Sequence, residues 1–246
     1  MSDCIVIIPT YNEKENIAHI IPYTLRLSDR LEVLVIDDGS PDGTAEIVKK
    51  LMPQFPNRIH LLERKGKLGL GTAYIKGFKW ALQHQYQYIF EMDADFSHPP
   101  EKLLELLDAC ENKGAYLSVG SRYVKGGSVV NWPFNRLFLS WFASKYVRII
   151  TGMRIKDTTA GFVCYRNETL SSIDFDKIKF IGYAFQIEMK YAVWLSDRKV
   201  LEVPIVFKDR EVGASKMSGG IIKEAVWGVL QMKWQALKNK RFYFFS

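Results

Sequence analysis

Short apolar runs alternate with polar, glycine-containing turns along the first hundred residues. Residues 4–8 are uninterruptedly apolar, which is typical of a strand buried on both faces. The same pattern predicts three more strands with helices between them: strands over 31–36, 59–62 and 88–92, and helices from residue 13, over 45–52 and over 72–83. This alternation favours an α/β fold in which a mostly parallel central sheet is flanked by helices.

The rest of the chain continues the pattern with longer helices. Strands are predicted over 116–120, 162–165 and 200–206, and helices over 101–110, from residue 133, over 183–195 and over 220–237. A chain of 246 residues suits one α/β domain, and we expect a single continuous sheet across both halves.

Two aspartates directly follow the strand predicted over 88–92. In extended backbone, residues i and i+2 point the same way, so Asp93 and Asp95 are expected to converge on one cation at the carboxyl end of the strand. Carboxylate oxygens suit Mg²⁺ or Mn²⁺, which take one or two protein carboxylates together with substrate phosphates. For an isolated Asp-x-Asp the alternative is a solvated turn.

Two other polar segments follow predicted strands. Pro9, Tyr11 and Glu13 come after the first strand, and Asp37 and Asp38 after the second. An aromatic ring can stack on a base, and carboxylates can accept hydrogen bonds from a base or a ribose. Together with the aspartate pair, these segments favour a nucleotide pocket over helix capping and turn formation alone.

Gly69 and Gly71 precede a predicted helix but match no phosphate-binding fingerprint. The loop lacks the third small residue of the dinucleotide motif and the Gly-Lys-Ser/Thr of a P-loop. Dehydrogenases and P-loop enzymes are therefore disfavoured, and close packing at a helix entry explains these glycines equally well.

The long helix after Trp132 has two stripes. One is apolar, and the other contains Arg136 and Ser140 at a spacing of four. Such a helix can hold a lipid whose head is a phosphate, although an ordinary surface helix has the same pattern. Glu188 falls on a largely apolar face of the helix over 183–195, so it needs a buried partner or a role.

Basic residues are the remaining candidates. Arg122 follows a strand, and Arg210 and Lys216 lie in a charged loop that can clamp a diphosphate, or is simply solvated. The helix over 220–237 combines Trp with lysines and leads to an aromatic tail, which suits a membrane interface or a helix docked on the core.

The net charge and the cysteine count limit the kinds of partner and the cellular compartment that we expect. The net charge of +7 favours an anionic partner, and three widely spaced cysteines indicate a reduced, cytoplasmic protein. We find no signal peptide and no apolar run of the roughly 18–20 residues that a membrane span needs.

Five motifs resemble the dolichyl-phosphate (polyprenyl-phosphate) mannose synthases of glycosyltransferase family 2, in their short form without transmembrane helices. They are Pro-Thr-Tyr-Asn-Glu at 9–13, Asp-Asp-Gly-Ser-Pro-Asp-Gly-Thr at 37–44, Lys-Leu-Gly-Leu-Gly-Thr-Ala-Tyr at 67–74, Asp-Ala-Asp-Phe-Ser-His at 93–98 and Asp-Arg-x-x-Gly-x-Ser-Lys at 209–216. The resemblance implies a GT-A (Rossmann-like) fold, GDP-mannose as donor, Mg²⁺ or Mn²⁺, and a polyprenyl (dolichyl) phosphate acceptor. It also implies a peripheral position on the cytoplasmic face of a membrane, sometimes with small membrane subunits.

The resemblance also assigns roles by matching position. The residues implied to hold the guanosine are Pro9, Tyr11, Glu13, Ile36 and Asp38. Those implied for the diphosphate and metal are Asp93, Ala94 and Asp95, and those for the phosphates and sugar are Arg122, Arg210 and Lys216. Arg122, Arg136 and Ser140 match positions for the acceptor phosphate, and some relatives have Gln as a further metal ligand where Ser97 stands.

The expected organisation is one domain over 1–246, with a nucleotide-binding half at 1–95, an acceptor-binding half at 96–219 and an amphipathic helix and tail at 220–246. Asp95, Arg210 and Lys216 are the expected catalytic residues of an inverting transfer. A phosphate monoester has its second pKa near 6, so such an acceptor attacks the sugar without a general base.

Other functions remain as alternatives. A related transferase can use UDP-glucose with a polyprenyl phosphate, or can transfer to a sugar hydroxyl, for which Glu188 is the candidate base. A nucleic-acid-binding protein is disfavoured, because the aromatic residues fall on apolar helix faces instead of among exposed basic residues. A catalytically inactive nucleotide-sugar sensor is disfavoured, because the Asp-x-Asp motif at 93–95 and Arg210 are both present.

Overall fold

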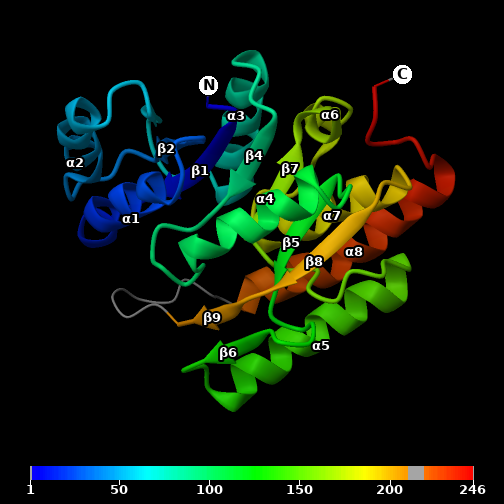
Figure 1. Ribbon diagram of the computed structural model, residues 1–246. Coiled ribbons are helices and arrows are strands. Elements are labelled where there is room, and N and C mark those ends of the chain that lie inside the picture. The colour runs from blue at the N-terminus through cyan, green and yellow to red at the C-terminus, as the bar shows by residue number, and fades with distance from the viewer. Residues whose placement is uncertain (1, 210–218, 246) are drawn as a thin grey trace.

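The computed structural model describes residues 2–209 and 219–245, and within them seven strands form the central sheet (Figure 1). The sheet has the order β3-β2-β1-β4-β7-β5-β8, and β7 is antiparallel to both of its neighbours while the other pairs are parallel. The strands are β1 (Cys4–Thr10), β2 (Leu31–Asp37), β3 (Ile59–Glu63), β4 (Tyr88–Glu91), β5 (Leu117–Ser121), β7 (Val163–Arg166) and β8 (Val200–Pro204). Strands from both sides of residue 95 therefore share one sheet.

Helices cover both faces of the sheet. They are α1 (Lys14–Leu27), α2 (Thr44–Leu51), α3 (Leu70–Gln83), α4 (Leu103–Glu111), α5 (Phe134–Thr151), α6 (Asn167–Leu170), α7 (Tyr183–Leu195) and α8 (Gly219–Lys238), with short 3-10 helices η1 (Met52–Gln54), η2 (Pro100–Lys102) and η3 (Phe175–Lys177). Alternate residues of β1 point to opposite faces, as period-2 geometry requires. Ile5 and Ile7 pack with α3 and α7, and Val6 and Ile8 pack with α1, α2 and α4. Helix α8 packs against α7 and α5.

The strand expected over 162–165 is β7, and it is antiparallel to β4 and β5. One strand prediction differs from the structure. The strand expected over 200–206 ends at Pro204, whose nitrogen has no proton for the ladder. After Ile205, β9 (Val206–Lys208) pairs instead with β6 (Ser128–Val130) in a second, two-stranded sheet.

The carboxyl ends of β2, β1 and β4 lie side by side, because these strands are parallel neighbours. As expected, Asp93 and Asp95 follow the strand, but the extended backbone assumed for the pair is wrong. β4 ends at Glu91, and the chain bends through residues 94–98, where Phe96 has a positive φ of 59°. The two aspartates therefore lie on a turn beyond the sheet, at the edge where ligands bind in open α/β folds.

Candidate active site

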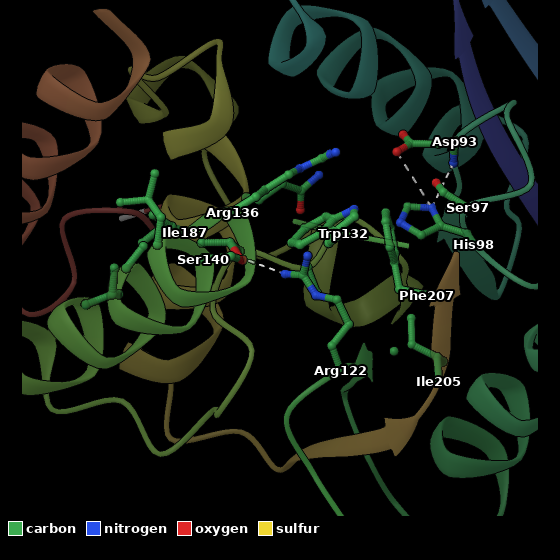
Figure 2. Close-up of a pocket in the computed structure, with 18 of the residues that line it drawn as sticks. Asp93, Ser97, His98, Arg122, Trp132, Arg136, Ser140, Ile187, Ile205 and Phe207 are labelled. Atoms are coloured by element: carbon green, nitrogen blue, oxygen red, sulfur yellow. Dashed lines mark hydrogen bonds and ion pairs between the residues drawn. The ribbon is translucent and has the colours of Figure 1, made fainter. Parts of the chain in front are cut away.

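A cavity of 520 Å³ begins beside the turn after β4 and extends along α5 and α7 toward α8. Its polar lining residues are Asp93, Asp95, Ser97, His98, Arg122, Arg136, Ser140, Thr159, Gln186 and Asp209, and its apolar ones include Leu139, Phe142, Ala143, Tyr146, Val147 and Val226. Figure 2 shows Asp93, Ser97 and His98 at one side and Ser140 and Ile187 at the other. The predicted cation-binding turn and the predicted lipid-phosphate stripe thus share one cavity.

Hydrogen bonds within the turn fix the aspartate pair. The backbone N–H of Asp93 donates to Nδ1 of His98 at 3.0 Å, and the backbone N–H of Ser97 donates to Oδ1 of Asp95 at 3.1 Å. Burial lowers the pKa of His98, which stacks on the ring of Phe162 with centroids 5.1 Å apart. A neutral imidazole that accepts at Nδ1 must hold its proton on Nε2. His98 is therefore a support for the turn that the sequence motif did not reveal.

The donor set of this turn fits a hard divalent cation. In the described part of the chain, no three His, Cys, Asp or Glu side chains gather as a metal site. Asp93 and Asp95 supply two carboxylates to the cavity, which is the usual protein share for Mg²⁺, whose other ligands are waters and substrate phosphates. The residues therefore suit an ion that arrives with a diphosphate.

The residues predicted to hold the nucleoside cluster at the ends of β1 and β2. Pro9 lies in β1, Tyr11 follows it, and Glu13 is the residue before the first turn of α1. The backbone N–H of Asp38 donates to the carbonyl oxygen of Thr10 at 3.0 Å, and this hydrogen bond connects the two strand ends. The Ile36 side chain is fully buried under α3, so it supports this region from within the core.

Asp38 forms a buried ion pair that the sequence analysis did not predict. Its two carboxylate oxygens accept from Nε and Nη2 of Arg64 at 2.5 and 2.7 Å. Arg64 also donates to Oγ1 of Thr72 and to the carbonyl oxygen of Gly69. The pair therefore joins the end of β2 to the glycine loop that opens α3.

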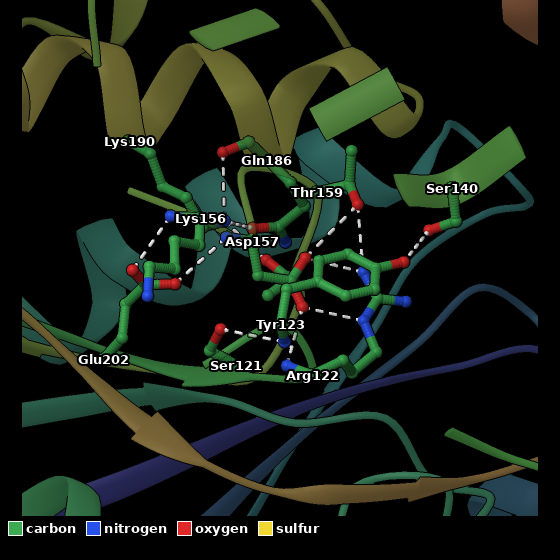
Figure 3. Close-up of polar contacts among 11 residues, drawn as sticks. Ser121, Arg122, Tyr123, Ser140, Lys156, Asp157, Thr159, Gln186, Lys190 and Glu202 are labelled. Atoms are coloured by element: carbon green, nitrogen blue, oxygen red, sulfur yellow. Dashed lines mark hydrogen bonds and ion pairs between the residues drawn. The ribbon is translucent and has the colours of Figure 1, made fainter. Parts of the chain in front are cut away.

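Arg122 is held by a second buried ion pair (Figure 3). Its Nε and Nη2 donate to the two oxygens of Asp157, each at 2.7 Å, and Nη2 also donates to Thr159 at 2.9 Å. Burial alone would raise the pKa of Asp157, but the Arg122 guanidinium holds that pKa below its usual range. Nearby, Ser140 accepts a hydrogen bond from the Tyr123 hydroxyl at 2.8 Å. Both predicted phosphate contacts thus have a fixed orientation in the cavity.

Arg136 lies between an aromatic ring and a carboxylate. Its guanidinium is 4.1 Å from the ring centroid of Trp132, and Nη1 donates to both oxygens of Asp209 at 3.0 and 2.9 Å. The predicted phosphate-binding residues Arg210 and Lys216 follow Asp209 and lie outside the residues that the structure describes.

Helix α7 presents Gln186 and Ile187 to the cavity, and Glu188 lies outside it. The Glu188 carboxylate accepts from the backbone N–H groups of Lys179 and Phe180 at 2.9 and 3.0 Å. Burial raises its pKa to about 7. This position does not support the role of a base at the sugar, and its partners are backbone groups instead of the buried Arg or Lys considered from the sequence.

The two stripes of α5 are arranged in an unusual way. Ser144 is buried on the inner side, while large apolar residues are exposed. Helix α8, which packs against α5, also has exposed aromatic residues, and we name the exposed aromatic residues of the two helices together the aromatic face: Phe134, Phe138, Trp141 and Phe142 of α5 and Trp227 and Trp234 of α8. Lys145 lies over the ring of Trp141 and Lys238 over that of Trp234, at 4.6 and 3.4 Å from their centroids.

Exposed tryptophan and phenylalanine beside lysine are typical of surfaces that meet a lipid headgroup layer. Among the helices within residues 2–209 and 219–245, none is long and apolar enough to cross a bilayer.

Known proteins resemble this chain over most of its length. The profile of the family described as glycosyl transferase family 2 matches residues 5–174. A polyprenol monophosphomannose synthase of Mycolicibacterium smegmatis is 47% identical over 227 residues, which cover 92% of this chain and 85% of that protein. An undecaprenyl-phosphate mannosyltransferase of Micrococcus luteus is 46% identical over 245 residues, covering 96% of this chain and 98% of that one.

A solved structure resembles the fold. It is glucosyl-3-phosphoglycerate synthase from Mycobacterium tuberculosis in complex with Mn²⁺, UDP and glucosyl-3-phosphoglycerate. The TM-score is 0.71 at 16% identity, over 95% of this chain and 80% of that one. At this identity the likeness concerns the fold alone.

Proposed function

Because the chain belongs to glycosyl transferase family 2 and has a GT-A fold, we propose that it transfers mannose from GDP-mannose to the phosphate of a polyprenyl phosphate. The products are polyprenyl phosphate mannose and GDP, with inversion at C1 of the sugar. The names of the two bacterial relatives support the mannosyl group and the polyprenyl acceptor.

One observation carries the proposal: the aspartate turn and an apolar passage belong to the same cavity. Asp93 and Asp95 line one part, and Phe142, Tyr146 and Val226 line another, with Arg122 and Arg136 also in the lining. A polar sugar-nucleotide donor and an acceptor with an apolar chain need this combination. The donor must be desolvated by polar groups and the chain of the acceptor by apolar ones. An acceptor with a small polar tail would have no use for the apolar part.

The chemistry of the acceptor agrees with the side chains that α7 contributes. A phosphate monoester is mostly deprotonated at neutral pH, so its oxygen can attack C1 of the mannose without losing a proton to the protein. Gln186 and Ile187, the α7 residues in the cavity lining, cannot accept such a proton. The catalytic requirement is then alignment of two anionic reactants and stabilisation of the leaving diphosphate.

Cationic groups meet that requirement. Arg122 and Arg136 are suited to hold the acceptor phosphate together with the Ser140 hydroxyl, and we assign Arg210 and Lys216 to the donor diphosphate. Mg²⁺ or Mn²⁺ bound to Asp93 and Asp95 would supply Lewis-acid stabilisation of the departing GDP.

The acceptor also suggests where the enzyme works. A polyprenyl phosphate resides in a bilayer, so we place the protein peripherally on the cytoplasmic face of a membrane, with the aromatic face toward the lipid. The exposed tryptophans of α8 and the neighbouring lysines support this orientation.

The test is transfer of radiolabelled mannose from GDP-mannose to a short polyprenyl phosphate in detergent, with Mg²⁺, Mn²⁺ or EDTA. We expect label in the organic phase with either metal and loss of transfer with EDTA. Transfer from UDP-glucose instead would overturn the donor, and label on a soluble sugar instead of the lipid would overturn the acceptor.

A further inference from the structure

Lys190 on α7 is fully buried, although lysine is a residue that proteins rarely bury. Its ammonium group donates to the carbonyl oxygen of Ala160 and to the carbonyl and side-chain oxygens of Gln186, the latter two at 3.1 and 3.3 Å. These acceptors are neutral dipoles. Lys190 lies behind the cavity lining, so it has no contact with a substrate.

Gln186 connects this lysine to β4. Its side-chain nitrogen donates to the carboxylate of Glu91, the last residue of β4, while its side-chain oxygen accepts from Lys190. Glu91 is also fully buried, two residues before Asp93. One amide thus bridges two buried charges of opposite sign, directly beneath the turn that carries the aspartate pair.

The same lysine holds one wall of the cavity. We name residues 157–161 the wall, because Thr159, Ala160 and Gly161 line the cavity directly after Asp157. Figure 3 shows its start at Asp157 next to Arg122, with Lys190 and Gln186 on α7 beside them. Asp157 is fixed by its ion pair to Arg122, and Ala160 is fixed by Lys190. The wall is therefore anchored near both ends by buried polar contacts.

We infer that Lys190 and Gln186 are positioning residues for the transfer: they fix the wall 157–161 against α7 and β4 and thereby set the distance between Arg122 and the aspartate turn. Buried charges generally stabilise a fold no better than apolar side chains of similar volume. The contacts of Lys190 and Gln186 join α7, β4 and the wall 157–161, which are far apart in sequence. This favours a geometric role for the two residues. The kinetic part of this inference rests on the proposed function, and its structural part does not.

The first test is Lys190→Met, which keeps an unbranched side chain shorter by one atom and removes its donors. We expect amide hydrogen exchange in residues 157–161 to become about tenfold faster. We also expect kcat of mannosyl transfer to fall about 10–100-fold with little change in the KM for the donor, because a small misplacement of reacting groups mainly affects the transition state. Lys199→Met is the matched control, since Lys199 donates to the carbonyl oxygen of Lys113 at the surface.

A second variant tests whether the effects come from the lost contacts of Lys190 or from the unpaired charge that Lys190→Met leaves on Glu91. Glu91→Gln combined with Lys190→Met removes both buried charges, so thermal stability should recover toward that of the wild type while exchange of 157–161 stays fast and kcat stays low. Recovery of kcat in the double variant, or unchanged exchange and kcat in Lys190→Met, would overturn the inference. Absence of transfer by the wild-type enzyme would refute the proposed function instead, and the exchange measurement would still decide the role of Lys190.

Discussion

At the scale of single residues, oppositely charged partners hold charged groups of the site in place. In the cavity Arg122 is paired with Asp157 and Arg136 with Asp209, and at the end of β2 Asp38 is paired with Arg64. An arginine oriented by a carboxylate is ready to meet a phosphate without reorganisation, which is the condition for strong electrostatic stabilisation.

Asp95→Ala should lower kcat by roughly 10²–10³-fold, because it removes one of two carboxylates suited to the metal and a hydrogen-bond acceptor of the turn. The measurement is mannosyl transfer at saturating metal. Asp176→Ala is the control, since Asp176 is exposed, pairs with Lys79 and does not line the cavity. A near-normal rate for Asp95→Ala with added Mn²⁺ would remove Asp95 from the site.

Glu188 should make folding stability depend on pH. Its pKa is raised from 4.5 to about 7 by burial, so its contribution is fully present below pH 4.5 and is lost as pH rises through about 7. Relative to Glu188→Gln, the wild type should lose about 2 kcal/mol of unfolding free energy between pH 5.5 and 8.

Urea titrations at both pH values measure the Glu188 effect. Glu168→Gln, at an exposed glutamate, should leave the pH dependence unchanged. If Glu188→Gln and the wild type follow the same pH dependence, the buried carboxyl does not change its proton affinity on folding.

At the scale of elements, α5 and α8 each do two tasks. Residues such as Arg136, Ser140 and Val226 line the cavity, and exposed aromatic residues form the aromatic face, with Phe142 belonging to both. In a soluble amphipathic helix the apolar stripe normally faces the core. The exposed apolar residues of α5 therefore support the proposed contact of this helix with lipid.

Trp227→Gln combined with Trp234→Gln should weaken binding to phospholipid vesicles at least about tenfold. Burying the apolar surface of each exposed indole in lipid can contribute more than about 1 kcal/mol of binding free energy. Vesicle sedimentation measures this. Leu104→Gln on α4, across the sheet, is the control. Equal binding of the double variant and the wild type would show that another surface meets the membrane.

At the scale of the whole molecule, the sheet gathers the aspartate turn and the strand ends predicted to bind the nucleoside, while α5 and α8 add the apolar passage. The net charge of +7 accompanies this arrangement and is spread along the chain. Near an anionic bilayer, each favourably placed lysine or arginine adds about 1 kcal/mol of attraction.

Binding to vesicles that contain anionic lipid should weaken about tenfold when NaCl rises from about 50 mM to about 500 mM, because salt screens exposed charges. Vesicles of neutral lipid provide the comparison and should show little salt dependence. Equal salt sensitivity on both kinds of vesicle would mean that charge does not contribute to membrane binding.

Much of this architecture could be predicted from apolar runs and turn residues. The run at residues 4–8 predicted β1, and the helix expected over 183–195 is α7 with the same bounds. The GT-A fold and the membership of family 2 are confirmed. The direction of β7 could not be predicted, because a strand of only four residues suits either orientation.

Side-chain orientation was the harder problem for the site. Helix α7 is apolar almost all round, so its periodicity could not distinguish Gln186, which faces the cavity, from Glu188, which does not. The partner of Arg136 is 73 residues away, and that of Arg122 is 35 residues away. Such pairs depend on tertiary packing, and no local pattern contains them.

The outward position of the aromatic face has a consequence for kinetics. If this surface keeps the enzyme on the bilayer and its cavity receives the acceptor from there, the lipid acceptor and the mannosylated lipid product both stay in the plane of the membrane. The rate should then follow the mole fraction of polyprenyl phosphate in the surface, and diluting it with inert lipid at constant bulk concentration should slow transfer.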